Sequence, residues 1–467
     1  MPDPIAGTGS ATNVALVCAR LAARGSDPAL WDAGREVSGH DLLARATWWT
    51  TRLSDVGVAQ GAVVAFTGDY CTESIALFLA LAVHGAIAVP FSVAAASEQG
   101  SLAAVAGVEW WAACDGTGAL RPATSPLLQH PLLAKLRADR HPGLVVFTSG
   151  STGKPKAILH DVDRVASKFV QMRRGWRTAL FLLMDHFGGF NTLLSCLAYD
   201  GVGICLPSRL PDDVCRAMTS ARAELLPTTP TFLAMLIASG VWRNYDLTSL
   251  RLITYGAEPM PEATLRRLPQ IFPNADLKQT YGLSELGVLR SASPDAGSLW
   301  LRVGGSGFET KVVDGVLHVR SQSNMLGYLN APSPIDADGW MSTGDLVEER
   351  DGLLKFVGRV SEMINVGGQK VLPAEVETVL LDADNVSDAT VSGARHPLLG
   401  QVVSARVSLI ADEDREAAVE RLRAHCRARL QKYKVPMRFE FVDIATHGTG
   451  RAKKRRFGAT DSEGSDR

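Results

Sequence analysis

The chain has 467 residues, of which 46% are hydrophobic and 21% are charged, and its formal net charge is −1. This length predicts a large body of fused subdomains and a smaller second domain. The balanced charge gives no reason to expect a nucleic-acid or membrane partner, and no apolar run approaches the roughly 20 residues of a membrane span. The start of the chain lacks the pattern of a secretory signal, and the seven scattered cysteines favour a reduced, cytoplasmic protein.

The first part of the chain alternates apolar, strand-like runs with helical stretches. Residues 61–69 predict a strand, residues 72–85 an amphipathic helix ended by glycine, and residues 86–92 a second strand. Further apolar runs that end in polar or glycine-rich turns follow at 144–150, 178–189, 201–207 and 250–258. This order predicts an α/β fold with doubly covered, parallel β-sheets, in which ligands collect where the strands end.

After residue 300 the pattern changes to short alternating runs, which predict antiparallel strands with Asp-Gly turns at 314–315 and 351–352. A helix at 372–382, two strands and a second amphipathic helix then predict a small α+β domain. We therefore expect an N-terminal domain over 1–358, a hinge at 359–361, a mobile C-terminal domain over 362–457 and a disordered tail over 458–467.

A glycine-rich stretch, FTSGSTGKPKA, directly follows the apolar run at 144–147. Glycines let the backbone point its N–H groups at one anion, hydroxyls add donors, and a lysine adds a mobile positive charge. The stretch is not a Walker P-loop, because Thr148 stands where that motif has its first glycine and Pro155 follows the lysine. The alternative is a surface turn, but its position after a buried strand favours phosphate binding by Thr148, Ser149, Gly150, Ser151, Thr152, Gly153 and Lys154.

This stretch resembles the phosphate-binding signature of the adenylate-forming superfamily, which includes acyl- and aryl-CoA ligases, peptide-synthetase adenylation domains and luciferases. The resemblance continues in order along the chain. It is carried by YGAEPMP (255–261), QTYGLSELG (279–287), DGWMSTGDL (338–346), GRVSEMINVGGQKVLPAEVE (358–377) and GTGRAKKRRF (448–457). The family reaction joins a carboxylate to the α-phosphate of ATP, releases pyrophosphate, and then transfers the acyl group to a thiol.

The resemblance implies roles for residues that bind ATP and Mg²⁺. Tyr281 is expected to stack on adenine, Asp345 to accept the ribose hydroxyls, and Arg359 to reach the ribose. Glu285 is expected to hold Mg²⁺, and the alternative interpretation is a solvated loop carboxylate. The adenine and phosphate sites are completed by Gly256, Ala257, Glu258, Gly282 and Ser284.

The acyl pocket is less well defined by the sequence. MDHFGGF (184–190) resembles the segment that places a gate beside the substrate carboxylate in CoA ligases, and His186 fits that position. An alignment shifted by one residue would put Asp185 there, as in peptide-synthetase domains, and a buried structural histidine is the third interpretation. The expected pocket residues are Asp185, His186, Phe187, Gly188, Thr229 and Gly256.

The hinge and the end of the chain contain the departures from the family pattern. Ser361 stands at a hinge position that is usually Asp or Lys, and Ala157 replaces a glycine. Gly367 and Gly368 match the pair that meets the pantetheine arm of CoA after the small domain rotates. Arg451 stands where the family has its catalytic lysine, so Arg451 itself, Lys453 or Lys454 must serve, unless this basic segment is only a solvated tail.

Three functions remain open from the sequence. The first is an ATP- and Mg²⁺-dependent ligase that joins a small carboxylic acid to coenzyme A. The second is an adenylating enzyme that loads the phosphopantetheine thiol of a carrier protein. The third, suggested by Arg451, is a protein that binds the adenylate with little catalysis.

Overall fold

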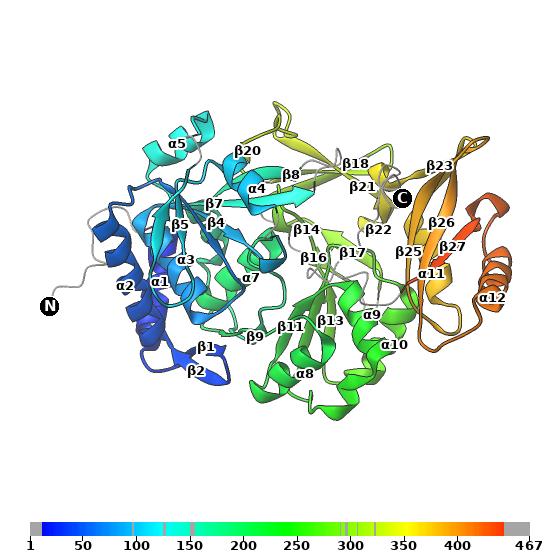
Figure 1. The fold of residues 1–467 in the computed structure, drawn as a ribbon, viewed down its shortest axis with the longest axis horizontal. Coiled ribbons are helices and arrows are strands. Elements are labelled where there is room, and N and C mark those ends of the chain that lie inside the picture. Colours follow the sequence, from blue (N-terminus) through cyan, green and yellow to red (C-terminus); the bar gives the residue numbers. More distant parts are fainter. Residues whose placement is uncertain are drawn as a thin grey trace.

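Two β-sheets with helices on both faces form the large body, and a third sheet joins it to a small domain at the C-terminal end (Figure 1). This computed structural model describes residues 12–95, 98–124, 128–149, 155–289, 291–294, 298–305, 307–321 and 324–442. The α/β fold class expected from the sequence is confirmed.

The first sheet carries the strands on either side of the glycine-rich stretch. Its order is β20–β8–β7–β4–β3–β5–β6, with bounds Gly327–Tyr328, Pro155–Asp161, Gly143–Ser149, Ile87–Phe91, Val63–Thr67, Trp110–Ala112 and Leu120–Pro122. The pairs β3–β4 and β4–β7 are parallel, whereas β7 and β8 are antiparallel. Since Ser149 pairs with Pro155, both strands end at residues 150–154, which lie outside the described residues.

The second sheet has the order β13–β12–β11–β9–β10–β1–β2. Its strands are Asp276–Gln279, Leu252–Tyr255, Leu225–Thr228, Arg177–Ala179, Val202–Ile204, Pro28–Asp32 and Arg35–Ser38. The pairs from β13 to β1 are parallel, as expected. The apolar run that begins the stretch at 178–189 forms only a short strand, because β9 ends at Ala179. The glycine-containing turn expected at its end is instead the start of α7 (Phe187–Ala198).

Helices fill the space between these two sheets and cover their outer faces. One core joins both sheets to α1 (Asn13–Arg24), α2 (Gly39–Val56), α3 (Thr72–His84) and α7. The outer face of the first sheet packs on α4 (Gln99–Ala106) and α5 (Pro131–Asp139), and that of the second packs on α8 (Pro211–Ser220), α9 (Pro230–Ser239) and α10 (Glu262–Ile271). Alternate residues of a strand point to opposite faces, so both faces of β3 are apolar.

Helix α3 begins and ends where the sequence predicts, but it is not amphipathic. The Cys71 sulfur accepts from the backbone N–H of Ser74, whose hydroxyl accepts from the backbone N–H of Cys71, and Gly85 ends the helix with φ 75°. Residues 74–82 are all buried. The helix lies between two sheets, so it has no solvent face to make polar.

The third sheet confirms the two predicted Asp-Gly turns. Its order is β16–β17–β22–β21–β19–β18, with bounds Ser291–Ala292, Trp300–Val303, Leu353–Arg359, Trp340–Arg350, Val316–Ser321 and Phe308–Val313. Asp314 and Gly315 join β18 to β19, and Asp351 and Gly352 join β21 to β22; all four have positive φ. Two consecutive positive φ angles match the right-handed twist of the flanking strands.

The small domain has a sheet and a core of its own, and lies at one end of the molecule (Figure 1). The sheet order is β24–β23–β26–β25, and β27 pairs with β26; the bounds are Gln369–Val371, Ile364–Val366, Gly400–Leu409, Val386–His396 and Arg438–Phe441. Helices α11 (Pro373–Leu381) and α12 (Arg415–Arg427) contribute apolar residues to this core. The domain and hinge boundaries proposed above remain predictions.

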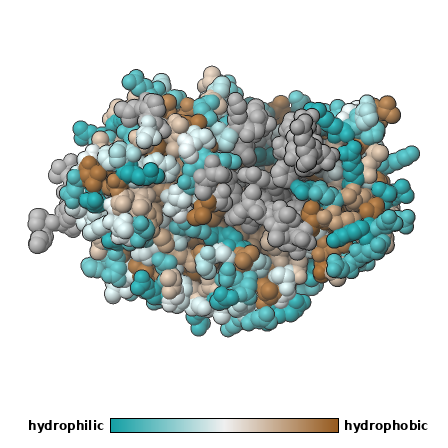
Figure 2. Space-filling model, in the orientation of Figure 1, coloured by the Kyte–Doolittle hydropathy of each residue, from teal (hydrophilic) through white to brown (hydrophobic). Residues whose placement is uncertain are grey.

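The described part of the surface carries no broad apolar area on the face drawn in Figure 2, where hydrophobic residues are scattered among hydrophilic ones. Within the described ranges, no helix has both the length and the apolar character needed to cross a membrane.

An ion pair at the start of α6 (Val162–Ala166) predicts a small pH dependence of stability. His141 Nδ1 lies 2.7 Å from Asp161 Oδ2, and this hydrogen bond raises the pKa of His141 above its usual value. The stabilisation is complete below the unfolded pKa of about 6.5 and is lost as pH rises through the folded pKa. His141→Gln should therefore lower the free energy of unfolding by less than about 1 kcal/mol at pH 6, and by less still at pH 8. Urea unfolding at both pH values checks this; an equal loss at both would contradict it.

Candidate active site

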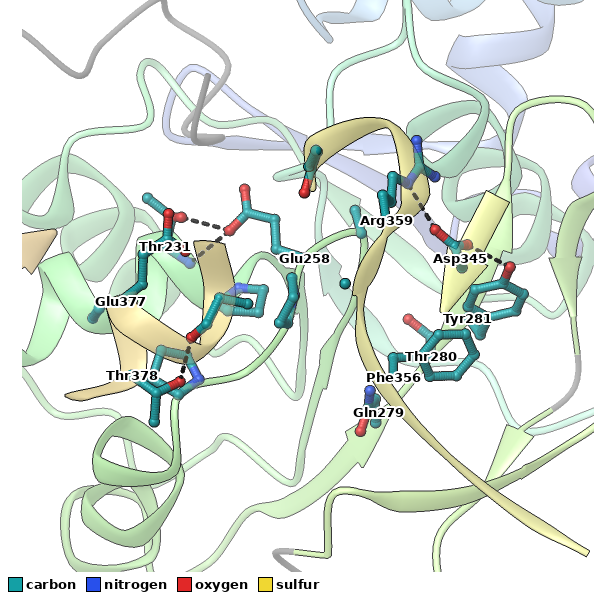
Figure 3. A pocket seen from close by; sticks show the side chains of 18 of the residues that line it. Thr231, Glu258, Gln279, Thr280, Tyr281, Asp345, Phe356, Arg359, Glu377 and Thr378 are labelled. Carbon is teal, nitrogen blue, oxygen red and sulfur yellow. Dashed lines mark hydrogen bonds and ion pairs between the residues drawn. The ribbon is translucent and has the colours of Figure 1, made fainter. Parts of the chain in front are cut away.

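A cleft lies between the large body and the small domain, and both line it (Figure 3). The large body contributes Pro230, Thr231, Ala234, Ala257, Glu258, Pro259, Pro261, Gln279, Thr280, Tyr281, Gly282, Leu283, Asp345, Phe356, Gly358 and Arg359. The hinge region and small domain contribute Glu362, Ala374, Glu377, Thr378, Leu381 and Asp388. The cleft thus brings together motifs that are far apart in the sequence.

Asp345 connects two of the residues that the sequence assigns to nucleotide binding. It is buried in β21, where its Oδ1 accepts from Arg359 Nε at 2.7 Å and its Oδ2 accepts from the Tyr281 hydroxyl at 2.6 Å. Each carboxylate oxygen has a second lone pair. Asp345 can therefore accept hydroxyl groups of a ligand while it still holds both neighbours.

Tyr281 begins β14 (Tyr281–Leu283), and its ring is fixed from one side. The ring stacks on Phe356 of β22, with centroids 4.3 Å apart and planes at 23°. Burial, followed by the charge of Asp345, raises the pKa of Tyr281 well above its usual value, so the hydroxyl remains a donor. A purine would have to lie on the face that Phe356 leaves free.

The loop after β12 forms the opposite wall of the cleft. A Cβ at Gly256 would lie 2.5 Å from the backbone oxygen of Thr280, so glycine is required there, and Ala257 has a positive φ of 69°. Glu258 Oε2 accepts from the hydroxyl of Thr231 at 2.5 Å and from its N–H at 3.2 Å, which ties the loop to the start of α9 (Figure 3). Thr229 caps this helix through its own hydroxyl.

Glu285 is held by a strand that pairs with β8, the strand that follows the glycine-rich stretch. Its Oε1 accepts from the hydroxyl of Tyr328 at 2.7 Å, and Tyr328 in β20 pairs with Ile158 of β8. Ser284 and Glu285 belong to the turn between β14 and β15 (Gly287–Leu289). Among the described residues, no group of three or more His, Cys, Asp or Glu could enclose a metal ion. Glu285 could thus supply one protein ligand to a cation whose other ligands come from phosphate and water.

Several predicted residues cannot be placed in the site. Of the glycine-rich loop, the structure describes the strand residue Thr148 and the backbone of Ser149. The described ranges leave out Gly150, Ser151, Thr152, Gly153, Lys154, Arg451, Lys453 and Lys454. Their roles remain predictions from the sequence.

Asp185 and His186 occupy different environments just before α7. Asp185 is buried, and its Oδ2 accepts from the Ser92 N–H at 3.2 Å, whereas His186 is about one third exposed at the N-cap position. A Cβ at Gly189 would lie 2.0 Å from the backbone oxygen of Leu183, so this turn needs glycine. The accessible position of His186 is compatible with the predicted gate. The Asp185 carboxylate, in contrast, accepts a hydrogen bond from the backbone N–H of Ser92.

Ser361 and the glycine pair are not among the described residues that line the cleft, although Ser361 lies between two that do. Ser361 is in the short 3₁₀ helix η4 (Val360–Glu362) beside Arg359. Gly367 and Gly368 form the turn between β23 and β24 with φ of 55° and 89°. Neither glycine is among the described cleft residues, so a role in CoA binding would require the small domain to move.

Sequence motifs did not identify several residues of the site. Phe356 supports Tyr281, Tyr328 holds Glu285, Thr231 holds Glu258, and α11 and β25 place Glu377, Thr378 and Asp388 in the cleft. These contacts depend on tertiary packing. The sequence contained one signal for these residues. The alternation of apolar residues predicts the strand β22, to which Phe356 belongs.

Two family models match the chain. The model of the AMP-binding enzymes matches residues 102–329, and that of the AMP-binding enzyme C-terminal domain matches residues 375–451. The chain therefore belongs to the AMP-binding enzymes of the adenylate-forming superfamily.

The related curated proteins include CoA ligases. The chain is 30% identical to the indoleacetate–CoA ligase of Aromatoleum aromaticum over 328 residues, which cover 65% of this chain and 64% of that protein. It is 28% identical to the 2-succinylbenzoate–CoA ligase of Geobacillus kaustophilus over 458 residues, 89% of this chain and 91% of that one. The chain spans less than two thirds of the length of several other curated relatives.

Solved structures share the fold over nearly the whole chain. An anthranilate CoA ligase in complex with anthranoyl-AMP has a TM-score of 0.80 at 21% identity, with 95% of both chains covered. The o-succinylbenzoate CoA synthetase of Bacillus subtilis, in complex with its acyl-adenylate intermediate, has a TM-score of 0.74 at 22% identity, with 95% of this chain and 99% of that chain covered.

Proposed function

We propose that this protein activates a small carboxylic acid with ATP, forms an acyl-adenylate and pyrophosphate, and transfers the acyl group to the thiol of coenzyme A. The observation that carries this proposal is the Asp345–Tyr281–Arg359 arrangement in a cleft shared by both domains. A buried carboxylate beside an aromatic ring suits a ribose and its base. The CoA ligases among the relatives support the choice of acid and thiol.

The first half-reaction brings two anions together, so donors and positive charge must offset their repulsion. Asp345 accepts the ribose hydroxyls and keeps Arg359 at the hinge. Residues 148–154 cover the β- and γ-phosphates, and Ser284 bonds the α-phosphate. Arg451 neutralises charge where the carboxylate attacks. His186, beside the expected acyl pocket, limits access to the carboxylate.

Mg²⁺ is the metal that this site suits, because Glu285 offers a single hard oxygen ligand and sits beside a strand that pairs with β8. When bound, Mg²⁺ neutralises charge on the phosphates. One oxygen of Glu285 accepts a hydrogen bond from the Tyr328 hydroxyl, and this bond orients the carboxylate.

Replacing Glu285 with glutamine should lower pyrophosphate exchange at least about 10²-fold and raise the Mg²⁺ concentration needed for half-maximal rate. Glutamine can still accept from Tyr328, so this variant tests the charge alone. Tyr328→Phe is the matched control, since it removes the hydrogen bond but keeps the carboxylate of Glu285. It should lower pyrophosphate exchange much less than Glu285→Gln does. A Glu285→Gln enzyme with unchanged Mg²⁺ dependence would remove this residue from the metal site.

Hydroxylamine trapping of acyl-adenylates across a panel of carboxylic acids tests the proposal. We expect ATP-dependent hydroxamate and pyrophosphate with at least one acid, and an acyl-CoA when CoA replaces hydroxylamine. Faster transfer to a phosphopantetheinyl carrier protein than to CoA would favour the second function. ATP binding without pyrophosphate exchange for any acid would favour the third function, a protein that binds the nucleotide with little catalysis.

A further inference from the structure

The ammonium group of Lys168 points inward but has no carboxylate partner among the residues that the structure describes. Lys168 lies in η2 (Ser167–Phe169), and although the side chain as a whole is half-buried, its Nζ donates to Asn191 Oδ1 of α7 and lies 5.0 and 5.6 Å from the ring centroids of Phe169 and Phe187. None of the described Asp or Glu residues lies within 4.0 Å of it. Burial lowers the pKa of Lys168 to about 7. A buried amine without an acid partner destabilises the fold, so packing alone does not explain it.

His160 is the second buried polar group in this region. It is fully buried on β8, its ring lies 4.5 Å from the ring of Phe187, and neither ring nitrogen makes a hydrogen bond. Burial lowers the pKa of His160 to about 3, so the ring is neutral and offers one donor and one acceptor. The positive charges of Lys168 and Arg164 lower this pKa further.

These groups surround the start of α7, where the acyl pocket is expected. Phe187 lies near both Lys168 and His160, and it directly follows His186. Asn191 follows Phe187 by four residues, so both lie on the same side of the helix. The cluster of Lys168, His160 and Asn191 therefore lies around the first turn of α7, directly after the expected gate residue His186.

We propose that this cluster recognises a second carboxylate on the acid that the protein activates, and so selects dicarboxylic over monocarboxylic acids. This inference rests on the proposed function. A second carboxylate would supply the counter-ion that Lys168 lacks, and it could accept from the N–H groups of His160 and Asn191. A monocarboxylic acid would leave these groups without partners. Sites built on buried polar groups discriminate strongly against ligands that lack the matching group.

The test compares each of three dicarboxylic acids (phthalic, isophthalic and adipic) with its own monomethyl ester, which keeps the size and removes one charge. Hydroxamate formation gives kcat and KM for each. In the wild type we expect kcat/KM for at least one dicarboxylate to exceed that for its ester at least about 10²-fold. Lys168→Met should reduce this ratio more than 10-fold, mainly by raising the KM of the dicarboxylate, and should leave the ester nearly unchanged.

Two further variants separate recognition from a structural role. Lys135→Met removes an exposed lysine paired with Asp139 and should leave the ratio unchanged. Asn191→Ala should reduce the ratio in the same direction as Lys168→Met. The melting temperature of Lys168→Met should equal or exceed that of the wild type, because an unpaired buried amine is removed.

The outcomes distinguish this inference from the function on which it rests. If the wild type adenylated monomethyl esters and dicarboxylates equally well, the inference alone would be overturned. The same would follow if Lys168→Met lowered kcat for both kinds of acid to the same extent. In either case the cluster would only enclose water. If no acid in this or the wider panel gave a hydroxamate, both the inference and the proposed function would fail.

Discussion

Replacing Asp345 with alanine should lower kcat/KM for ATP in pyrophosphate exchange by about 10²- to 10³-fold. The carboxylate accepts from Arg359 at 2.7 Å and from Tyr281 at 2.6 Å, so its removal leaves two donors without their partner. Tyr281 is buried, so its hydroxyl left unpaired costs about 1–3 kcal/mol, whereas Arg359 is partly exposed and can bond water. The contact to the ribose hydroxyls is lost as well. Most of the change should appear in the KM for ATP.

Two controls make the Asp345 result specific. Glu349→Ala changes an exposed carboxylate on the same strand and should have no effect on the KM for ATP. Asp345→Asn keeps one oxygen acceptor but places an amide donor against the other partner. Its loss of kcat/KM for ATP should therefore lie between that of Asp345→Ala and the wild type. A folded Asp345→Ala enzyme with the wild-type KM for ATP would exclude the ribose role.

Replacing Arg451 with alanine should lower adenylation by about 10²- to 10³-fold, the usual effect of removing one group that stabilises transition-state charge. Thioester formation from a supplied acyl-adenylate should change little, because the charge on the attacking carboxylate and α-phosphate develops only in the first half-reaction. The two half-reactions are measured separately, by pyrophosphate exchange and by acyl-CoA release. Equal losses in both would contradict this role.

Neighbouring basic residues test whether Arg451 acts alone. Arg451→Lys restores the residue expected from the family pattern and should keep adenylation within a few-fold of the wild type, although the planar guanidinium and the ammonium differ in geometry. Lys453→Ala and Lys454→Ala should have small effects. If Lys454→Ala reproduced the full loss, the catalytic charge would belong to Lys454.

Local rules of chain geometry accounted for much of the fold. The Asp-Gly turns at 314–315 and 351–352 were predictable because few other residue pairs adopt two positive φ angles. Gly85 ended α3 for a related reason. The run at 178–189 could not be divided correctly, because a short buried strand, an irregular segment and the start of a buried helix are all apolar.

The site residues were predictable only where a motif contained them. The family pattern identified Asp345, Tyr281 and Arg359 one by one. It did not predict that the carboxylate of Asp345 accepts hydrogen bonds from both of the other residues. Phe356 and Tyr328 belong to strands with no chemical signature, and they enter the site through sheet register. Lys168 and His160 gave no signal in the sequence, since burial of a lysine without a carboxylate, or of a histidine without a hydrogen bond, is visible only in three dimensions.

A crystal structure of the protein with ATP and Mg²⁺ tests the central claim most directly, and it does not require the acid to be known. The proposed function predicts a purine on the face of Tyr281 that Phe356 leaves free, ribose hydroxyls on Asp345, and phosphates between residues 148–154 and Glu285. A nucleotide bound elsewhere, with Tyr281 and Asp345 untouched, would contradict it.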